Sequence, residues 1–394
     1  MSRCGLILLL AASFISCPSG NAPSSASQQP LFTHAPGSPV KIECGPSNIL
    51  IADMNNDRKL DLVVACARAR SITVLEGKGN GQFGAALSNT TVPDPPHEIA
   101  AGDLNGDGKL DVVAATHDSY GAMLLKGDGK GGLTQSPTIV MKLGQHPHTH
   151  GLAIADLNRD NKLDLITCNA TDNDISLAFG DGRGNFTRAP QSFPVGPSPY
   201  PFGVGDVNSD GSPDIVATAT ATGPSRREQL PLSRALTLLL SDGKGSFSPR
   251  QLPIRTGEPW FAAIADLNRD GKADILATHH EMSALTVMFG DGRGGFTEAN
   301  GSPFDFGTAV FHFIVADVDR DKMMDVVATS GASIRVLLGD KTGGFRSAAA
   351  AIPVGPGAWR LAAADLNGDG AIDVVTSNSD SNSVSVLLGK PTAP

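Results

Sequence analysis

Asp365-Leu366-Asn367-Gly368-Asp369-Gly370-Ala371-Ile372-Asp373 is one copy of the pattern that decides the fold of this chain. The pattern is Asp-x-Asn/Asp-x-Asp-x-x-x-Asp, and the sequence contains seven copies of it. Successive copies start 50, 53, 50, 60, 51 and 48 residues apart. A near-constant period of this length is typical of repeat proteins, in which each repeat forms one unit that packs on its neighbours. The other six copies begin at Asp53, Asp103, Asp156, Asp206, Asp266 and Asp317.

Each repeat contains four short runs that favour β-strands. In the second repeat, an apolar run at 97–102 leads into the acidic loop and a β-branched run at 111–116 leaves it. A third run at 122–125 ends in the glycine-rich turn 127–133, and a more polar run follows at 135–141. No window sustains a helical period, and Gly or Pro interrupts the sequence every few residues. Four short strands in about 50 residues predict one blade of a β-propeller.

The two ends of the chain predict how the ring of blades closes. The last repeat stops after its third strand, at 384–388. Near the N-terminus, the segment 31–36 (Leu-Phe-Thr-His-Ala-Pro) parallels the fourth strand of the third repeat at 185–190 (Asn-Phe-Thr-Arg-Ala-Pro). We therefore expect an all-β, seven-bladed propeller of four-stranded blades over residues 31–394, with an N-terminal strand completing the last blade.

Residues 1–22 resemble an export signal. Arg3 supplies positive charge, an apolar run spans 6–15, and the small residues at 20–22 provide a cleavage site. The apolar run is too short to span a bilayer, and no later segment is long enough, so no transmembrane segment is expected. Residues 23–30 predict a flexible leader. We therefore expect a secreted or cell-surface protein.

The cysteines fit an exported protein. Cys17 lies in a stretch that faintly resembles a bacterial lipoprotein box, but the Phe three residues before it and the Pro after it depart from that box, so lipidation is disfavoured. Cys44 and Cys66 would lie at the same end of the first blade, where an exported protein can form a disulfide. Cys168 is left over and is expected to be a buried free thiol.

The charge of the chain is concentrated in the seven acidic loops. They hold 22 Asp among the 40 acidic residues of a chain whose formal net charge is −9. No basic stripe is present, which argues against nucleic-acid binding. One divalent cation in each loop would offset the acidity, so the charge is better explained by bound metal than by solubility.

The loop pattern has the chemistry of a calcium site. Ca²⁺ prefers six to eight oxygen ligands, and side chains at alternate positions of a tight turn can point at one centre. The loops contain no thiol or imidazole, which disfavours zinc, whereas Mg²⁺ would need octahedral geometry. Position 6 is Gly in four loops, and Asn161 there tolerates a left-handed conformation. Loops 1 and 6 have Arg58 and Lys322 instead and are expected to bind more weakly, although Asp319 adds a carboxylate to loop 6.

These loops, with their Phe-Gly and glycine-rich turns at about 50-residue spacing, resemble FG-GAP (VCBS-type) repeats. Such repeats form the seven-bladed propeller of integrin α-subunit heads and of many exported bacterial proteins. The resemblance implies up to seven structural calcium ions on one face, ligand contacts on the opposite face, and no fixed function. It implies metal ligands at positions 1, 3, 5 and 9 of each loop, which are Asp53, Asn55, Asp57, Asp61, Asp103, Asn105, Asp107, Asp111, Asp156, Asn158, Asp160, Asp164, Asp206, Asn208, Asp210, Asp214, Asp266, Asn268, Asp270, Asp274, Asp317, Asp319, Asp321, Asp325, Asp365, Asn367, Asp369 and Asp373.

A second set of equivalent positions lies six residues before each loop. Six of these seven positions are aromatic or His, the exception being Ser47. They begin the innermost strand of each blade and should surround the central channel on the face opposite the metals. The ends of the second strands should return to that face. The candidate ligand-binding residues from both sets and their neighbours are His97, His117, His150, Tyr200, Trp260, His279, His280, Phe311, His312, Trp359 and Arg360.

Three interpretations of this second set stay open. The side chains can simply plug the channel and pack the blades, or they can stack on a sugar or another planar ligand. In a catalytic interpretation, as in a polysaccharide lyase, the acid, base and charge-stabilising groups would be His97, Glu98, His117, Tyr200 and Arg360. A zinc site within residues 146–150, where His occupies alternate positions, is a further alternative.

From the sequence we expect a monomeric binding or adhesion module rather than an enzyme. Its ligand, a glycan or a protein, would meet the face opposite the calcium loops. The alternative is a lyase-like enzyme that acts on extracellular polysaccharide through the same face, although no nucleophile elbow and no paired carboxylates are found there.

Overall fold

The computed structural model describes residues 30–143, 148–220, 234–279, 282–348 and 350–390. Residues from Leu31 onward form one compact unit. The predicted export signal with Cys17, nearly all of the predicted leader, His146 and His280 lie outside the described residues. The described residues contain no helix whose length and apolar character would suffice to cross a bilayer.

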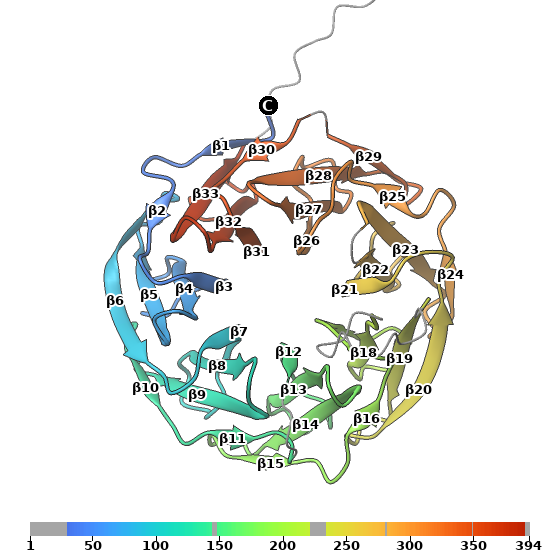
Figure 1. The fold of residues 1–394 in the computed structure, drawn as a ribbon, viewed down its shortest axis with the longest axis horizontal. Coiled ribbons are helices and arrows are strands. Elements are labelled where there is room, and N and C mark those ends of the chain that lie inside the picture. Colours follow the sequence, from blue (N-terminus) through green and yellow to red (C-terminus); the bar gives the residue numbers. More distant parts are fainter. Residues whose placement is uncertain (1–29, 144–147, 221–233, 280–281, 349, 391–394) are drawn as a thin grey trace, which may run out of the picture. The chain divides into compact units, whose positions relative to one another are not determined.

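The described residues form seven antiparallel sheets arranged as the blades of a propeller (Figure 1). Blade 1 comprises β3 (Pro46–Ala52), β4 (Asp61–Cys66), β5 (Ser71–Gly77) and β6 (Phe83–Thr91). Blade 2 comprises β7 (Pro96–Gly102), β8 (Asp111–Thr116), β9 (Gly121–Gly127), β10 (Leu133–Gln135) and β11 (Ile139–Val140). Blade 3 comprises β12 (Thr149–Ala155), β13 (Asp164–Asn169), β14 (Asp174–Gly180), β15 (Phe186–Arg188) and β16 (Phe193–Pro194).

The remaining four blades repeat this order. They comprise β17 (Gly203–Gly205), β18 (Asp214–Ala217), β19 (Ala235–Ser241), β20 (Phe247–Pro253); β21 (Pro259–Ala265), β22 (Asp274–His279), β23 (Ala284–Gly290), β24 (Phe296–Glu298), β25 (Phe304–Asp305); β26 (Phe313–Ala316), β27 (Asp325–Ser330), β28 (Ser333–Gly339), β29 (Phe345–Ser347), β30 (Ile352–Pro353); and β31 (Ala358–Ala364), β32 (Asp373–Asn378), β33 (Ser383–Gly389), β1 (Phe32–His34), β2 (Val40–Lys41).

The outermost strand differs in detail from the prediction of one fourth strand per blade. It is continuous in blades 1 and 4, whereas in the other five blades two short strands share its place. Pro36, Pro137 and Pro190 lie in three of these interruptions. A Pro in a ladder removes a backbone donor, so the edge strand pairs in two short pieces there.

The middle strands are buried because blades pack face to face. All six residues of β4 (Asp-Leu-Val-Val-Ala-Cys) are buried. Leu62 and Val64 pack into the cluster shared with blade 7, whereas Val63 and Ala65 pack into the cluster shared with blade 2. This alternation follows from the two-residue period of a strand and explains why the middle strands are continuous apolar runs.

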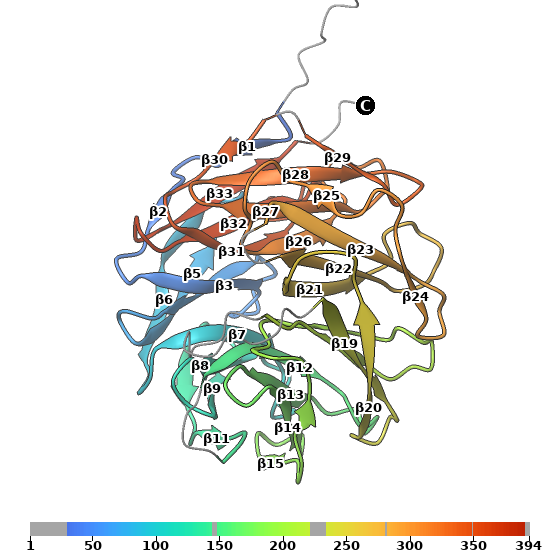
Figure 2. The same cartoon turned by 45° about the vertical axis from the view of Figure 1, so that its right-hand side comes forward.

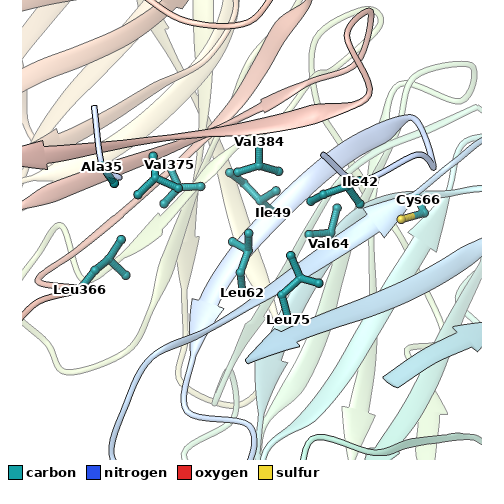
Figure 3. Packing of buried hydrophobic residues seen from close by; sticks show 11 residues of the cluster. Ala35, Ile42, Ile49, Leu62, Val64, Cys66, Leu75, Leu366, Val375 and Val384 are labelled. Carbon is teal, nitrogen blue, oxygen red and sulfur yellow. The ribbon is translucent and has the colours of Figure 1, made fainter. Parts of the chain in front are cut away.

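The N-terminal strand closes the ring as predicted. β1 pairs antiparallel with β33, with Phe32 opposite Gly389, so the first and last strands of the propeller lie side by side (Figures 1 and 2). Figure 3 shows the apolar cluster between the last and first blades, which includes Val375 and Val384 of blade 7 and Leu62 of blade 1. This packing leaves no open edge between these two blades.

The predictions for Cys44, Cys66 and Cys168 are also confirmed. Cys44 and Cys66 form a disulfide with their Cα atoms 5.1 Å apart, at the end of blade 1 opposite its acidic loop. Cys168 is a buried free thiol, and burial raises the pKa of that thiol well above its ordinary value.

The seven acidic loops share one backbone conformation. Positions 4 and 6 of every loop have positive φ, including Arg58 at 66° and Lys322 at 75°. The sequence pattern predicted the turn at position 6 but not the one at position 4. Non-glycine residues in this conformation are strained by about 1–2 kcal/mol each, so the loop geometry is imposed by the fold even where no glycine is present.

The cost of this conformation can be measured at Gly271, where an added Cβ would meet no atom within 4 Å. Gly271→Ala is expected to lower the free energy of unfolding by about 1–2 kcal/mol because φ is positive there. Gly271→Asn is the matched control and should lose less, since Asn161 occupies the equivalent position at 61°. Urea unfolding of both variants in excess calcium gives the comparison, and an Ala variant as stable as the parent would refute the argument.

The glycine-rich turn of one blade is hydrogen-bonded to the acidic loop of the preceding blade. Gly131 N donates to the carbonyl of Met54, and Gly184 N donates to the carbonyl of Leu104, both at 3.1 Å. Gly294 N bonds Val207 in the same way at 3.3 Å. Order in an acidic loop is therefore transmitted directly to the next blade.

Candidate functional site

The acidic loops place their carboxylates by backbone hydrogen bonds. In loop 5, Asp266 accepts from the N–H groups of Asp270 at 3.1 Å and Gly271 at 3.0 Å. Asp274 accepts from Leu267 and from Gly290, each at 2.9 Å. The ninth residue thus ties the start of its own loop to the end of the third strand, and the same two bonds occur in all seven loops.

The ninth carboxyl group of every loop is fully buried, at 0% exposure. Burial raises the pKa of each group, and neighbouring carboxylates of the same loop add to the rise. The pKa rises to about 6 for Asp164 and Asp373, and to about 7 for Asp325. Such groups resist ionisation unless a cation compensates their charge.

Loop 6 gives the sharpest test of whether a cation fits. Asp317, Asp319 and Asp325 offer carboxylate oxygens that all lie within 4.8 Å of one another. The Oδ1 atom of Asp317 is buried and accepts no hydrogen bond. Asp319, the residue that distinguishes this loop, is one of the three converging groups. An all-oxygen set with an unpartnered buried oxygen suits a hard cation such as Ca²⁺.

The set of residues six positions before the loops surrounds a cavity at the opposite end of the blades. The cavity has a volume of about 450 Å³. Its wall contains six of the seven predicted positions, together with Arg68, Glu98, His117 and Arg360. The seventh, Phe311, is not in the wall, but its ring centroid lies 5.3 Å from that of Trp359, and both rings are more than one third exposed. The predicted gathering of these side chains is therefore observed, whereas ligand binding by them stays a prediction.

Backbone bulges direct several of these side chains. The register between the first and second strands shifts between Pro46 and Asn48, and an equivalent shift spans His97 and Trp260 in their own blades. A bulge inserts a residue that has no partner in the ladder and turns its side chain away from the regular face. The sequence period located these positions, but the bulge that makes them project was not predictable from it.

A stack of three rings lines one side of the cavity. The ring centroids of His150 and Tyr200 are 4.1 Å apart, and those of Tyr200 and Trp260 are 3.8 Å apart, with interplanar angles of 22° and 24°. The three residues come from three successive blades. Burial lowers the pKa of His150 to about 2 and raises the pKa of Tyr200, so both rings are neutral at pH 7.

A buried ion pair closes the floor of the cavity. Arg360 of β31 donates to Glu98 of β7, and Asn48 of β3 donates to the other Glu98 oxygen at 2.7 Å. Burial raises the pKa of Glu98, and the charge of Arg360 opposes that rise. Glu98 and Arg360 also form the roof of a second cavity of about 250 Å³ deeper in the channel, whose wall includes His312.

Four histidines cluster beside the ring stack, and three of them, His97, His117 and His150, lie in the wall of the large cavity. The ring centroid of His117 is 5.5 Å from that of His97, 3.8 Å from that of His148 and 5.1 Å from that of His150. Burial lowers the pKa of His97 and lowers that of His148 to about 4. Asp118 Oδ1 lies 2.9 Å from Nδ1 of His117, and this bond holds the pKa of the Asp118 carboxyl below its usual range.

Two predicted residues lie away from the large cavity. His279 is buried, its Nε2 is 2.7 Å from the hydroxyl of Thr286, and burial lowers its pKa to about 4. His312 accepts a hydrogen bond from the N–H of Leu361 at 3.2 Å and faces the deeper cavity. The list of candidate ligand-binding residues did not include Glu98 and His148, although the catalytic interpretation named Glu98 and the zinc alternative covered His148.

Comparisons with known proteins agree with this architecture. A family model described as FG-GAP-like repeat matches residues 53–114, 103–167, 266–328 and 317–376, which together cover more than half of the chain. No curated protein sequence matches the chain significantly.

Several solved structures share the fold. A crystal structure of BBS1N in complex with ARL6DN has a TM-score of 0.61 at 12% identity, covering 92% of this chain and 98% of that chain. An Agrocybe aegerita protein described as recognising non-reducing terminal N-acetylglucosamine has a TM-score of 0.53 at 17% identity. The match covers 84% of this chain and 85% of that chain. An inactive variant of virginiamycin B lyase from Staphylococcus aureus with quinupristin has a TM-score of 0.55 at 12% identity. The match covers 90% of this chain and 99% of that chain. At these identities the likeness concerns the fold alone.

Proposed function

Because the chain belongs to the family of FG-GAP-like repeat proteins, we propose that it is an exported, calcium-stabilised propeller that binds a glycan or protein ligand in the cavity opposite its acidic loops. The observation that carries the proposal is that six equivalent positions of the repeat meet as aromatic, His and Ser side chains around one cavity. The predicted export signal and the Cys44–Cys66 disulfide fit a secreted or cell-surface location.

Calcium is proposed as a structural cofactor of the loops. Its ligands would be the side chains at positions 1, 3, 5 and 9, and bound calcium would neutralise carboxylates that are otherwise crowded together. The fully buried ninth residues and the unpartnered Asp317 oxygen support this assignment. Because four of the loops are hydrogen-bonded to the glycine-rich turn of the next blade, the ions would stabilise contacts between blades as well as the loops themselves.

The cavity favours a ligand with flat, partly apolar faces and polar edges. Trp260, at the end of the ring stack, and the exposed ring of Trp359 offer apolar faces, while Arg68 and His117 offer polar groups at the wall. Sugar rings combine these properties, since their C–H faces pack on aromatic rings and their hydroxyl groups need hydrogen-bond partners. Among the two ligand classes, a glycan is therefore the better match.

The ligand proposal is tested with a glycan array followed by calorimetric titration of the best glycan. Trp260→Ala is expected to weaken binding at least tenfold because it removes a stacking face, which corresponds to about 1.4 kcal/mol. Tyr200→Phe keeps the stack and should bind nearly as well as the parent, whereas Tyr200→Ala should not. Leu87→Ala, an exposed substitution on the outer strand β6, is the control.

Equal glycan affinity in the parent and in Trp260→Ala, with both proteins folded, would place the ligand elsewhere. A cavity that binds no glycan and no protein from a defined panel would support the packing interpretation, in which these rings only fill the mouth of the channel.

A lyase-like activity is the second candidate. It is favoured by one observation, the presence of His97, Glu98, Tyr200 and Arg360 in the wall of a single cavity. The Glu98 carboxylate is already engaged by Arg360 and Asn48, which leaves His97 and Tyr200 as proton-transfer groups. Ultraviolet absorbance of unsaturated products from acidic polysaccharides gives a direct assay. Turnover that is lost in His97→Ala would replace the binding-module proposal with the enzymatic one.

A further inference from the structure

We propose that His117, His148 and His150 form a three-histidine site for a transition-metal cation of the zinc type in the wall of the large cavity. Each of these residues offers one ring nitrogen, and the three nitrogens all lie within 4.8 Å of one another. Zinc–nitrogen bonds of about 2.0–2.1 Å in a tetrahedral site place the nitrogens about 3.4 Å apart, so small rotations of the three side chains would bring these nitrogens onto one ion. The site is independent of the acidic loops and of the identity of the cavity ligand.

The backbone brings the three residues together from two neighbouring blades. His117 directly follows β8, whereas His148 directly precedes β12 and His150 is its second residue. As alternate residues of an extended segment, His148 and His150 project to the same side. Thr149 N donates to the carbonyl of His117 at 3.1 Å, and Thr149 Oγ1 donates to the carbonyl of Ser119 at 3.0 Å. These bonds fix the end of β8 against the start of β12, so the imidazoles are held close without a ligand.

The hydrogen bonding leaves nitrogen atoms available to a cation. Nε2 of His150 is buried and has no hydrogen-bond partner, a condition that a native structure rarely leaves unexplained. Nδ1 of His117 bonds the carboxylate of Asp118, which fixes the proton on Nδ1 and leaves Nε2 with a lone pair. A carboxylate that orients a histidine in this way is a usual partner of metal-binding imidazoles.

The donor set selects the class of metal. Imidazole nitrogen suits Zn²⁺, Cu²⁺ and Ni²⁺ better than the hard cation Ca²⁺, which prefers oxygen. Three protein ligands leave at least one coordination position open. His117 and His150 both lie in the wall of the cavity, so that position would be accessible to water or to an anionic group of a cavity ligand.

The test is a titration of the full-length protein with Zn²⁺ in an excess of Ca²⁺ that saturates the acidic loops. One tightly bound Zn²⁺ per chain is expected, and Co²⁺ in its place should give the intense visible absorption of four-coordinate Co²⁺ rather than the weak absorption of the hydrated ion. His117→Ala should weaken Zn²⁺ binding at least tenfold, and Asp118→Asn should weaken it about 10–100-fold. His34→Ala, which removes an exposed His on β1, is the control and should bind as the parent does.

Two results would overturn the proposal. One is Zn²⁺ binding that is unchanged in both His117→Ala and His148→Ala, with folding verified by circular dichroism. The other is the absence of any Zn²⁺, Cu²⁺ or Ni²⁺ binding that survives excess Ca²⁺. Neither result would bear on the glycan titration, which can be carried out in a chelator specific for transition metals.

Discussion

Removing calcium is expected to lower the unfolding midpoint of this propeller by roughly 10–15 °C. At a calcium concentration about ten times Kd, each bound ion contributes about 1.4 kcal/mol, so seven ions contribute about 10 kcal/mol. The shift of the unfolding midpoint is this free energy divided by the entropy of unfolding, which is about 2.1 cal/mol/K for each residue of the propeller. The effect is large because the sites are numerous, although each site on its own is weak.

The pH dependence of the calcium-free protein follows from the buried ninth residues. The ordinary pKa of Asp is 3.8, and burial raises it in the folded chain to about 6 for Asp164 and Asp373 and about 7 for Asp325. At a pH between the ordinary pKa and the raised pKa, these carboxyl groups keep their protons in the folded state and have released them in the unfolded state. The stability that these groups contribute is therefore present below about pH 4 and is lost as the pH rises through about 6 to 7. Calcium, which binds the ionised form, should remove this loss.

Thermal unfolding in EDTA and in calcium, each at about pH 5 and about pH 7.5, measures both effects. The calcium-dependent shift should be larger at the higher pH. Asp266→Ala, which removes the first ligand of loop 5, should reduce the shift by about one seventh, and magnesium should restore less of it than calcium. A midpoint that does not change on chelation at the higher pH would contradict the calcium proposal.

The architecture of the fold could be predicted from the sequence because one pattern recurs seven times. A period near 50 residues fixed the blade length, and the similarity of residues 31–36 to 185–190 located the closing strand. The split outer strands and the positive φ at position 4 of the loops were not predictable in this way. They depend on how an edge strand and a loop adapt to their neighbours, which a local pattern does not record.

The candidate cavity was predictable in position but not in its interior contacts. Counting six residues back from each loop found six residues of its wall, because every blade has the same register there. The ends of the second strands placed His279 at that face, yet Gly257 packs over its ring, where a Cβ would lie 2.3 Å from Nδ1. The ion pair of Glu98 and Arg360 joins residues 262 positions apart, so no repeat pattern could reveal it.

That ion pair gives the second large effect, since Glu98→Met is expected to destabilise the protein by about 3–5 kcal/mol. The Glu98 and Arg360 side chains are only 13% and 10% exposed, and Nε of Arg360 is buried and has no hydrogen-bond partner. Removing the carboxylate therefore leaves a buried guanidinium without its counter-charge. Because Glu98 belongs to blade 2 and Arg360 to blade 7, the loss would loosen the inner strands on both sides of blade 1.

Urea unfolding of a double-variant cycle separates the ion pair from simple loss of packing. Glu98→Met/Arg360→Met removes both charges at similar volume and should be more stable than Glu98→Met alone, because no unpaired charge remains. Glu76 of β5 forms an exposed ion pair with Lys78. Glu76→Met, which breaks this pair, is the matched control and should lower the free energy of unfolding by less than about 1 kcal/mol. If the effects of the two substitutions on the free energy of unfolding were instead additive, Glu98 and Arg360 would not act as a pair. The closed floor of the cavity would then depend on packing alone.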